Sequence, residues 1–317
     1  MTKLAFVFPG QGSQVIGMGQ DVYEQVRSAK ALFDKADECL EPGFTNLIFN
    51  GEKETLTLTQ NAQPALLTTS MALYQTFLER GGMKPDYAAG HSLGEYTAYT
   101  AMGAMSFEDA VKLVRRRGLY MEEAVPKGEG AMSAILGADE NMLADVVGSV
   151  TEGGHPVQLA NINSPGQIVI SGTAEGVRLA SELAKERGAK RSMPLVVSGP
   201  FHSSLMKPAA RMLEEALSGI QMTEPDSPVV ANYTAKPAVA EEIKASLVHQ
   251  LYSPVKWQQS VEYMIGEGVD TFVEFGPGTV LSGLIKKINR KARTYSIKDL
   301  ETCDHVIAQL KGGKANE

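Results

Sequence analysis

Cysteine and tryptophan are scarce in this chain, which holds two cysteines and one tryptophan among 317 residues. The two cysteines, Cys39 and Cys303, lack C-x-x-C spacing. This count rules against a disulfide framework and against a thiolate zinc site. Unpaired cysteines are typical of a reducing compartment, so we expect a cytoplasmic protein.

Long apolar runs and excess positive charge are missing as well. No stretch approaches the roughly 20 apolar residues that a membrane span requires. The first apolar run, Leu4 to Phe8, ends at Pro9-Gly10, which makes it too short for a signal peptide and favours a buried strand. A net charge of −7 disfavours nonspecific binding to nucleic acid. We therefore expect a soluble protein whose partners are neither nucleic acid nor membrane.

The remaining composition is that of a globular protein, with 43% hydrophobic and 21% charged residues. Apolar runs predict strands that alternate with amphipathic helices, an order typical of a parallel α/β sheet. We predict helices at 20–39, 62–80 and 107–124, and strands at 4–8, 86–89, 229–232 and 271–275. The predicted fold class is α/β, with a parallel-sheet, α/β-hydrolase-like large domain formed by residues 1–126 and 197–317.

Residues 127–196 show a different order of elements. Strand-like segments at 131–136, 157–161, 167–171 and 191–197 are interrupted by helical patterns at 140–150 and 175–187. The order β-α-β-β-α-β is that of the ferredoxin-like motif. We therefore predict a small ferredoxin-like domain at 127–196, inserted into the large one.

Ser92 lies in the pentapeptide Gly90-His91-Ser92-Leu93-Gly94, between a predicted strand and a predicted helix. That context is typical of a nucleophile elbow, a sharp turn that exposes a serine hydroxyl. The N–H of Leu93 at the helix start could stabilise an oxyanion. A glycine-rich turn without catalytic function is the alternative, since such short motifs also occur by chance.

A serine nucleophile needs a base, and His202 is the best of five histidines because it follows a Gly-Pro turn that leaves the small domain. A surface histidine at a helix start is the alternative. The loop around Gln11 lacks the glycine pattern of a dinucleotide site and the Gly-Lys-Ser/Thr of a phosphate loop. Its Gln11 N–H could instead be a second oxyanion donor.

Three consecutive arginines, Arg115, Arg116 and Arg117, lie in the predicted helix 107–124. Such a run is usually a solvated helix face. Consecutive helical residues point about 100° apart, however, so one arginine can face inward and bind a carboxylate.

Five motifs occur together in order along the chain, and jointly they are far more specific than any one alone. They are Phe8-Pro9-Gly10-Gln11-Gly12-Ser13-Gln14, Gly90-His91-Ser92-Leu93-Gly94-Glu95-Tyr96, Asn161-x-Asn163-Ser164-Pro165-Gly166-Gln167, Gly199-Pro200-Phe201-His202-Ser203 and Glu274-Phe275-Gly276-Pro277-Gly278. With them the chain resembles, over nearly its whole length, the malonyl-CoA:acyl carrier protein transacylases of bacterial type II fatty acid synthesis.

The resemblance implies a ping-pong transfer of malonyl from malonyl-CoA to acyl carrier protein through Ser92. It assigns His202 as the base and Arg117 as the ligand of the malonyl carboxylate. It also implies that the side-chain carbonyl of Gln250 orients His202. The same family pattern implies oxyanion donors at Gln11 and Leu93 and substrate contacts at Phe201 and Asn163.

No cofactor is implied, because the two thiol substrates carry the phosphopantetheine themselves. The carrier proteins of this family are acidic, so docking to this acidic chain would need a local basic patch. Lys190-Arg191 and Lys286-Lys287 are candidates; solvated element ends are the alternative. An acyltransferase of a polyketide pathway and a serine esterase or thioesterase are the other functions considered. Esterases of the α/β-hydrolase class place their histidine near the C-terminus, after the acidic residue.

Overall fold

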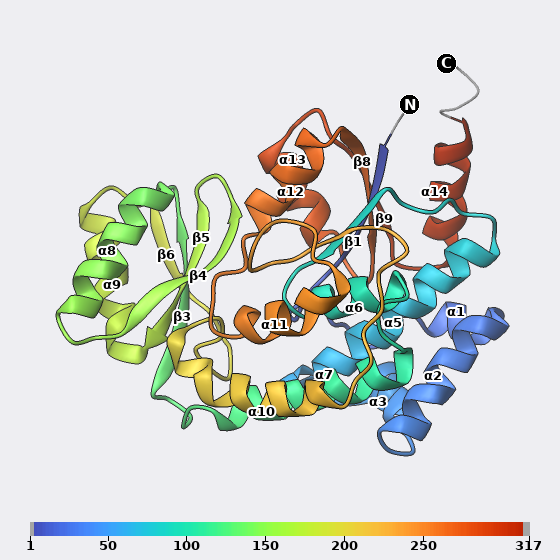
Figure 1. Ribbon diagram of the computed structural model, residues 1–317, viewed down its shortest axis with the longest axis horizontal. Coiled ribbons are helices and arrows are strands. Elements are labelled where there is room, and N and C mark those ends of the chain that lie inside the picture. Colours follow the sequence, from blue (N-terminus) through green and yellow to red (C-terminus); the bar gives the residue numbers. More distant parts are fainter. Residues whose placement is uncertain (1–2, 313–317) are drawn as a thin grey trace.

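The main sheet consists of five parallel strands in the order β7-β2-β1-β8-β9 (Figure 1), in a computed structural model that describes residues 3–312. These strands are β1 (Lys3–Phe8), β2 (Tyr87–Gly90), β7 (Val229–Val230), β8 (Val269–Phe275) and β9 (Arg293–Ile297). The predicted parallel α/β sheet is therefore confirmed. Ligands of such sheets gather at the carboxyl ends of the strands, which is where Gln11 and Ser92 follow β1 and β2.

Strand β1 is buried on both faces, which explains its continuous apolar sequence. Phe6 and Phe8 point into the larger of two hydrophobic clusters, whereas Ala5 and Val7 point into the other. The ring of Phe6 lies 4.8 Å from that of Phe275, in an edge-to-face arrangement. Each buried phenylalanine contributes roughly 1.5–3 kcal/mol to the free energy of unfolding.

Helices cover both faces of the main sheet (Figure 1). The face with Ala5 and Val7 packs against α12 (Trp257–Gly266) and α13 (Val280–Ile288). The helices that contribute to the other cluster are α1 (Gln20–Gln25), α2 (Arg27–Cys39), α3 (Phe44–Asn50), α4 (Lys53–Thr57), α5 (Thr59–Glu79), α6 (Leu93–Ala101), α7 (Phe107–Glu123), α10 (Lys207–Ser218), α11 (Ala240–Gln250) and α14 (Leu300–Gly312). A short 3₁₀ helix, η1 (Ser204–Met206), precedes α10.

A second sheet, antiparallel throughout, lies at one end of the molecule (left in Figure 1). Its strand order is β4-β5-β3-β6, with α8 and α9 as the two crossover helices. Its elements are β3 (Gly130–Leu136), α8 (Glu140–Glu152), β4 (Val157–Ser164), β5 (Gln167–Thr173), α9 (Ala174–Glu186) and β6 (Arg191–Pro194). This is the predicted ferredoxin-like order.

Backbone hydrogen bonds connect strand β4 of the small sheet to Val255, which lies between α11 and α12 of the large domain. Ile162 N–H donates to the Val255 carbonyl at 2.9 Å, and Val255 N–H donates to the Ala160 carbonyl at 2.8 Å. The strands of the small sheet extend from residue 130 to residue 194. The domain boundaries at 127 and 196 stay a prediction.

Several element boundaries differ from those predicted. The helix predicted over 20–39 is interrupted at Val26, whose backbone is extended with φ −123° and ψ 116°. Asn163 and Ser164, predicted in a loop, belong to β4, so the turn to β5 consists only of Pro165-Gly166. The segment predicted as extended over 191–197 is a strand only as far as Pro194; Leu195 N–H still donates to the Met132 carbonyl of β3 at 3.0 Å, and the chain leaves the sheet after it. Within residues 3–312 no helix is long and apolar enough to cross a membrane.

Candidate active site

Ser92 occupies a strained turn between β2 and α6. Its φ of 52° and ψ of −105° are unusual for a residue with a Cβ. The two flanking glycines make the turn possible: a Cβ at Gly94 would lie 2.0 Å from the Phe8 carbonyl oxygen, and one at Gly90 would lie 1.9 Å from the carbonyl carbon of Gly94. The turn has the geometry of a nucleophile elbow.

Ser92 and His202 form a hydrogen-bonded pair. Ser92 Oγ lies 2.8 Å from His202 Nε2, and His202 Nδ1 lies 2.8 Å from the Gln250 backbone oxygen. A carbonyl oxygen only accepts, so Nδ1 carries the proton and Nε2 is free to accept the serine proton. Burial, assisted by the positive charge of Arg117, lowers the pKa of His202 to about 3, against the opposing effect of the Gln250 hydrogen bond. The imidazole is therefore a neutral base.

Gln250 orients His202 through its backbone, so the prediction that its side-chain carbonyl does so is wrong. Gln250 is the last residue of α11, and carbonyls in a last helical turn have no acceptor role within the helix. The Gln250 carbonyl is thus available to His202. Its side-chain carbonyl instead accepts from Arg117 Nη2 at 3.0 Å.

Arg117 is only 1% exposed and points toward Ser92 from α7. Its Nη1 donates to Gln63 Oε1 at 2.7 Å, and its Nη2 donates to Ser92 Oγ at 3.0 Å. Within residues 3–312, its buried Nε makes no well-formed hydrogen bond and no carboxylate lies within ion-pair distance, although the Tyr96 ring lies 5.1 Å from the guanidinium carbon and the Tyr96 side chain interacts with the same group. Three of the five guanidinium N–H groups are therefore hydrogen-bonded, to Gln63, Ser92 and Gln250, and the Nε–H is not among them.

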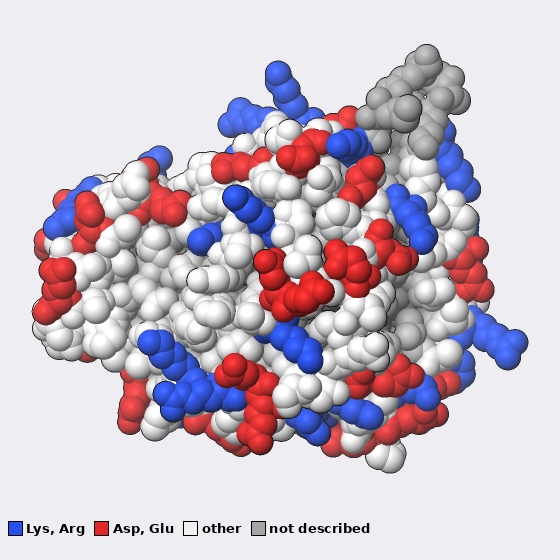
Figure 2. All heavy atoms as spheres, viewed as in Figure 1, with Lys and Arg blue, Asp and Glu red and all other residues white. Residues whose placement is uncertain are grey.

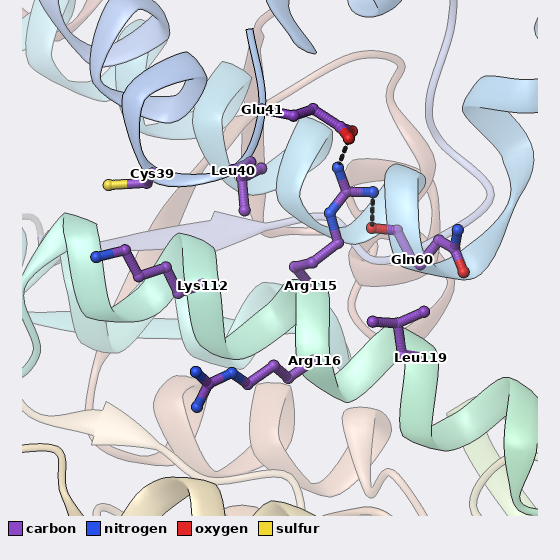
Figure 3. Close-up of a pocket in the computed structure, with 8 residues that line it drawn as sticks. All are labelled: Cys39, Leu40, Glu41, Gln60, Lys112, Arg115, Arg116 and Leu119. Atoms are coloured by element: carbon purple, nitrogen blue, oxygen red, sulfur yellow. Dashed lines mark hydrogen bonds and ion pairs between the residues drawn. The ribbon is translucent and has the colours of Figure 1, made fainter.

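The other two arginines of the run lie on the outer side of α7. Figure 3 shows Arg115 directed to Glu41 and to the backbone oxygen of Gln60, whereas the Arg116 side chain extends away from both. Both line an open surface pocket of about 590 Å³, together with Cys39, Leu40, Glu41, Gln60, Lys112 and Leu119. That pocket contains none of the predicted site residues. Of the three arginines, only Arg117 faces inward.

A cavity of about 210 Å³ lies in front of Ser92. Its walls include four of the predicted site residues: Gln11, Ser92, Phe201 and His202. The Gln11 loop approaches the elbow closely, because a Cβ at Gly10 would lie 2.5 Å from the His91 carbonyl oxygen. Among the described residues, neither Gln11 N–H nor Leu93 N–H donates a hydrogen bond. Gln11 lies on the cavity wall, whereas Leu93 is buried and follows Ser92 directly.

Of the three predicted substrate-binding residues, only Phe201 lies on the cavity wall; Arg117 reaches the serine from behind the wall, and Asn163 lies off it as well. The side-chain oxygen of Asn163 lies 2.8 Å from Nε2 of His91, a residue that lines the cavity. Asn161, two residues earlier in β4, lines the cavity instead.

Behind Ser92 and Arg117 lie three buried polar residues that the sequence did not point to. They are Gln63, Glu95 and Asn232, and they hydrogen-bond to the site residues. Asn232 Oδ1 accepts from Ser92 N–H at 2.8 Å. Glu95 Oε2 accepts from Asn232 N–H at 3.0 Å and from Gln250 Nε2 at 2.7 Å. Burial raises the pKa of Glu95 to about 7, although these hydrogen bonds and Arg117 oppose the rise. A usable signal was the position of Glu95 three residues after Ser92, in the first turn of α6.

The four candidate docking residues are exposed. Lys190 and Arg191 lie at the start of β6, and Lys286 and Lys287 lie in the last turn of α13. Lys287 Nζ donates to Gln167 Oε1 at 2.9 Å, which places the α13 pair beside the β4–β5 turn. On the face shown in Figure 2, acidic and basic side chains are interspersed.

Comparisons with known proteins agree with this geometry. The family model described as an acyl transferase domain matches residues 5–311. The chain is 59% identical over 312 residues to the malonyl CoA-acyl carrier protein transacylase of Bacillus subtilis (strain 168), covering 98% of each chain. The solved transacylase of Coxiella burnetii superposes with a TM-score of 0.95 at 41% identity, covering 98% of both chains.

A further solved structure is similar to the chain at 41% identity, with a TM-score of 0.94. It contains a malonyl-transacylase in complex with a type II PKS acyl-carrier protein, and the match covers 97% of this chain and 100% of that one.

Proposed function

This chain belongs to the malonyl CoA-acyl carrier protein transacylases, and we propose that it transfers malonyl from malonyl-CoA to the phosphopantetheine thiol of an acyl carrier protein. One observation carries the proposal: a buried guanidinium, with no carboxylate partner among residues 3–312, donates to the hydroxyl of a serine that is paired to a neutral histidine. A serine that reacts next to a fixed positive charge favours acyl groups that carry their own carboxylate.

In the first half-reaction Ser92 Oγ attacks the thioester carbonyl while its proton passes to His202 Nε2. The N–H groups of Gln11 and Leu93 stabilise the resulting oxyanion. Collapse of the intermediate breaks the carbon–sulfur bond, and the CoA sulfur leaves with the proton from His202. The product is a malonyl ester of Ser92.

In the second half-reaction His202 Nε2 accepts the proton of the carrier's thiol, and the sulfur attacks the ester carbonyl. The carbon–oxygen bond to Ser92 breaks, and Ser92 Oγ regains the proton from His202. Exchange of one thioester for another changes little in free energy, so the reaction needs no bound cofactor. We place it in the cytoplasm, which the two unpaired cysteines fit.

Arg117 selects the acyl group. A malonyl carboxylate at its Nε and Nη2 edge would contribute about 1.5–3 kcal/mol through charge-assisted hydrogen bonds. An acetyl group would leave that buried charge without a counter-ion. Arg117→Ala should therefore lower kcat/KM for malonyl-CoA by roughly 10- to 150-fold while acetyl-CoA is retained or improved. An unchanged ratio of the two substrates would remove the carboxylate role.

The transfer itself is tested with malonyl-CoA in the presence and absence of a holo carrier protein. We expect rapid malonylation of the carrier and slow release of free malonate, with no transfer by Ser92→Ala. Release of malonate at the same rate with and without carrier would identify a hydrolase instead.

A further inference from the structure

A buried carboxylate, Glu95, lies behind the Ser92 turn and takes no part in the mechanism above. Its side chain is 0% exposed, and it stands three residues after Ser92 on α6. Two hydrogen bonds end on the same oxygen: Oε2 accepts from Asn232 N–H at 3.0 Å and from Gln250 Nε2 at 2.7 Å. The hydroxyl of Tyr99, one turn later on α6, also interacts with the carboxyl group. A buried carboxylate without an ion-pair partner is costly, which calls for an explanation.

The amide of Gln250 is the link between Glu95 and the reacting groups. Its Nε2 faces three acceptors, of which Glu95 Oε2 is the nearest; the Ser92 carbonyl follows at 2.9 Å and Asn232 Oδ1 at 3.2 Å. Its Oε1 therefore faces the opposite way, where it accepts from Arg117 Nη2 at 3.0 Å. A reversed amide would put oxygen against carboxylate and an NH₂ group against the guanidinium.

Arg117 depends on that orientation. Gln63 holds its Nη1, and Gln250 Oε1 and Ser92 Oγ share its Nη2. Without the Gln250 acceptor, the guanidinium would lose one of the two glutamine amides that hold it. A shift of about 1 Å at such a group is enough to reduce catalysis substantially.

We propose that Glu95 is a positioning residue that fixes the Gln250 amide and so aims Arg117 at the acyl group on Ser92, setting the preference for acyl groups that end in a carboxylate. This rests on the proposed malonyl transfer. Glu95 itself touches neither nucleophile nor substrate. Its contribution is the orientation of a neutral amide and, through it, of a cation.

Glu274 offers a matched control elsewhere in the fold. It is also 0% exposed, and its carboxylate accepts from Leu281 N–H at 3.0 Å and Ser282 N–H at 2.8 Å at the start of α13. It does not line the cavity at Ser92. Glu274→Met should lower the melting temperature while leaving the malonyl-to-acetyl ratio of kcat/KM unchanged.

The test compares Glu95→Met, which removes the acceptor, with Glu95→Gln, which keeps an oxygen where both hydrogen bonds end. Glu95→Met should raise KM for malonyl-CoA about tenfold and change acetyl-CoA turnover less than about threefold. Glu95→Gln should keep the malonyl preference within about twofold. In an Arg117→Ala background, Glu95→Met should have no further effect on the ratio.

Equal losses on both acyl-CoA substrates, an intact preference in Glu95→Met, or a loss in Glu95→Gln as large as in Glu95→Met would each overturn the proposal. If Glu95→Met does not fold, Glu95→Asp tests the same contact, because it retracts the carboxylate from Gln250 and should reduce the malonyl preference. The proposed malonyl transfer is tested separately, by transfer in the wild type and its absence in Ser92→Ala. A failure of the transfer can therefore be told apart from a failure of the positioning role of Glu95.

Discussion

Three side chains set the electrostatics around Ser92. Arg117 places a buried positive charge near the hydroxyl, His202 accepts the hydroxyl proton without carrying charge, and Glu95 supplies a carboxyl group behind them. The positive charge of Arg117 disfavours protonation of the His202 imidazole and so lowers its pKa. An arriving malonyl carboxylate would offset the arginine charge and make the histidine a stronger base.

The lowered pKa of His202 predicts how kcat/KM and kcat depend on pH. A lowered pKa keeps His202 unprotonated as the pH falls, so kcat/KM for malonyl-CoA should stay flat from pH 7.5 through the ordinary histidine pKa of about 6.5 and down to about 5. In the malonyl complex the pKa should rise, so the acid limb of kcat should lie at higher pH than that of kcat/KM. Steady-state pH profiles check both statements.

Glu95→Gln serves as the control for that profile, since it removes the carboxyl whose pKa is raised to about 7. An acid limb of kcat/KM near pH 6.5 that persists in Glu95→Gln would contradict a neutral, desolvated His202.

Individual site residues differ in how well the sequence predicts them. Ser92 and His202 could be predicted as a pair, and they lie 2.8 Å apart, because each belongs to a short local motif whose backbone geometry depends on neighbouring residues. The supporting network could not, because Glu95, Asn232 and Gln250 meet only after α6, β7 and α11 have packed. The backbone role of Gln250 was mispredicted for the same reason, since a carbonyl at a helix end is available in any sequence.

At the scale of elements, the turn from β2 into α6 depends on close approach between backbones. A Cβ at Gly94 would collide with the Phe8 carbonyl oxygen of β1, and no flexible side chain is there to yield. Gly94→Ala should therefore lower the free energy of unfolding by about 3 kcal/mol. Urea unfolding followed by circular dichroism measures this.

Gly148 in the middle of α8 provides the matched comparison, because a Cβ there would meet nothing within 4 Å. Gly148→Ala should raise the free energy of unfolding by about 0.5–1 kcal/mol through helix propensity. Equal effects of the two substitutions would show that the elbow tolerates a side chain.

Elements with strong periodicity were predicted well, and those defined by packing were not. Strand β1 and helix α7 have apolar patterns that reflect their own burial. The break at Val26 leaves no such signal, because Val26 is buried and apolar at helical spacing from Val22 and Ala29, and only its backbone departs from the helix. Strand β9 has exposed and half-buried residues in four of five positions, which gives it no apolar run to detect.

At the scale of the whole molecule, an acidic chain must still receive an acidic carrier if the proposed function holds. Net charge opposes that encounter, so a local basic patch has to guide it. Lys286 and Lys287 are candidates for such a basic patch. Lys287 contacts Gln167 at the β4–β5 turn, so the pair lies where the end of α13 meets the small sheet.

Reversing both charges, Lys286→Glu with Lys287→Glu, should raise KM for the carrier protein and leave KM for malonyl-CoA unchanged. The same reversal at Lys30 and Lys35 on α2, which lies away from the small sheet (Figure 1), changes the net charge equally and should not affect carrier KM. Equal effects on both substrates, or equal effects of the two double variants, would contradict docking at α13.

The proposed transfer requires a malonyl group held covalently by Ser92. Brief exposure of the protein to malonyl-CoA, followed by mass spectrometry of the intact chain and of its peptides, tests this most directly. We expect one malonyl adduct, located on Ser92 and lost when holo carrier protein is added. Carrier malonylation with no adduct, or an adduct on another residue that transfers competently, would contradict it.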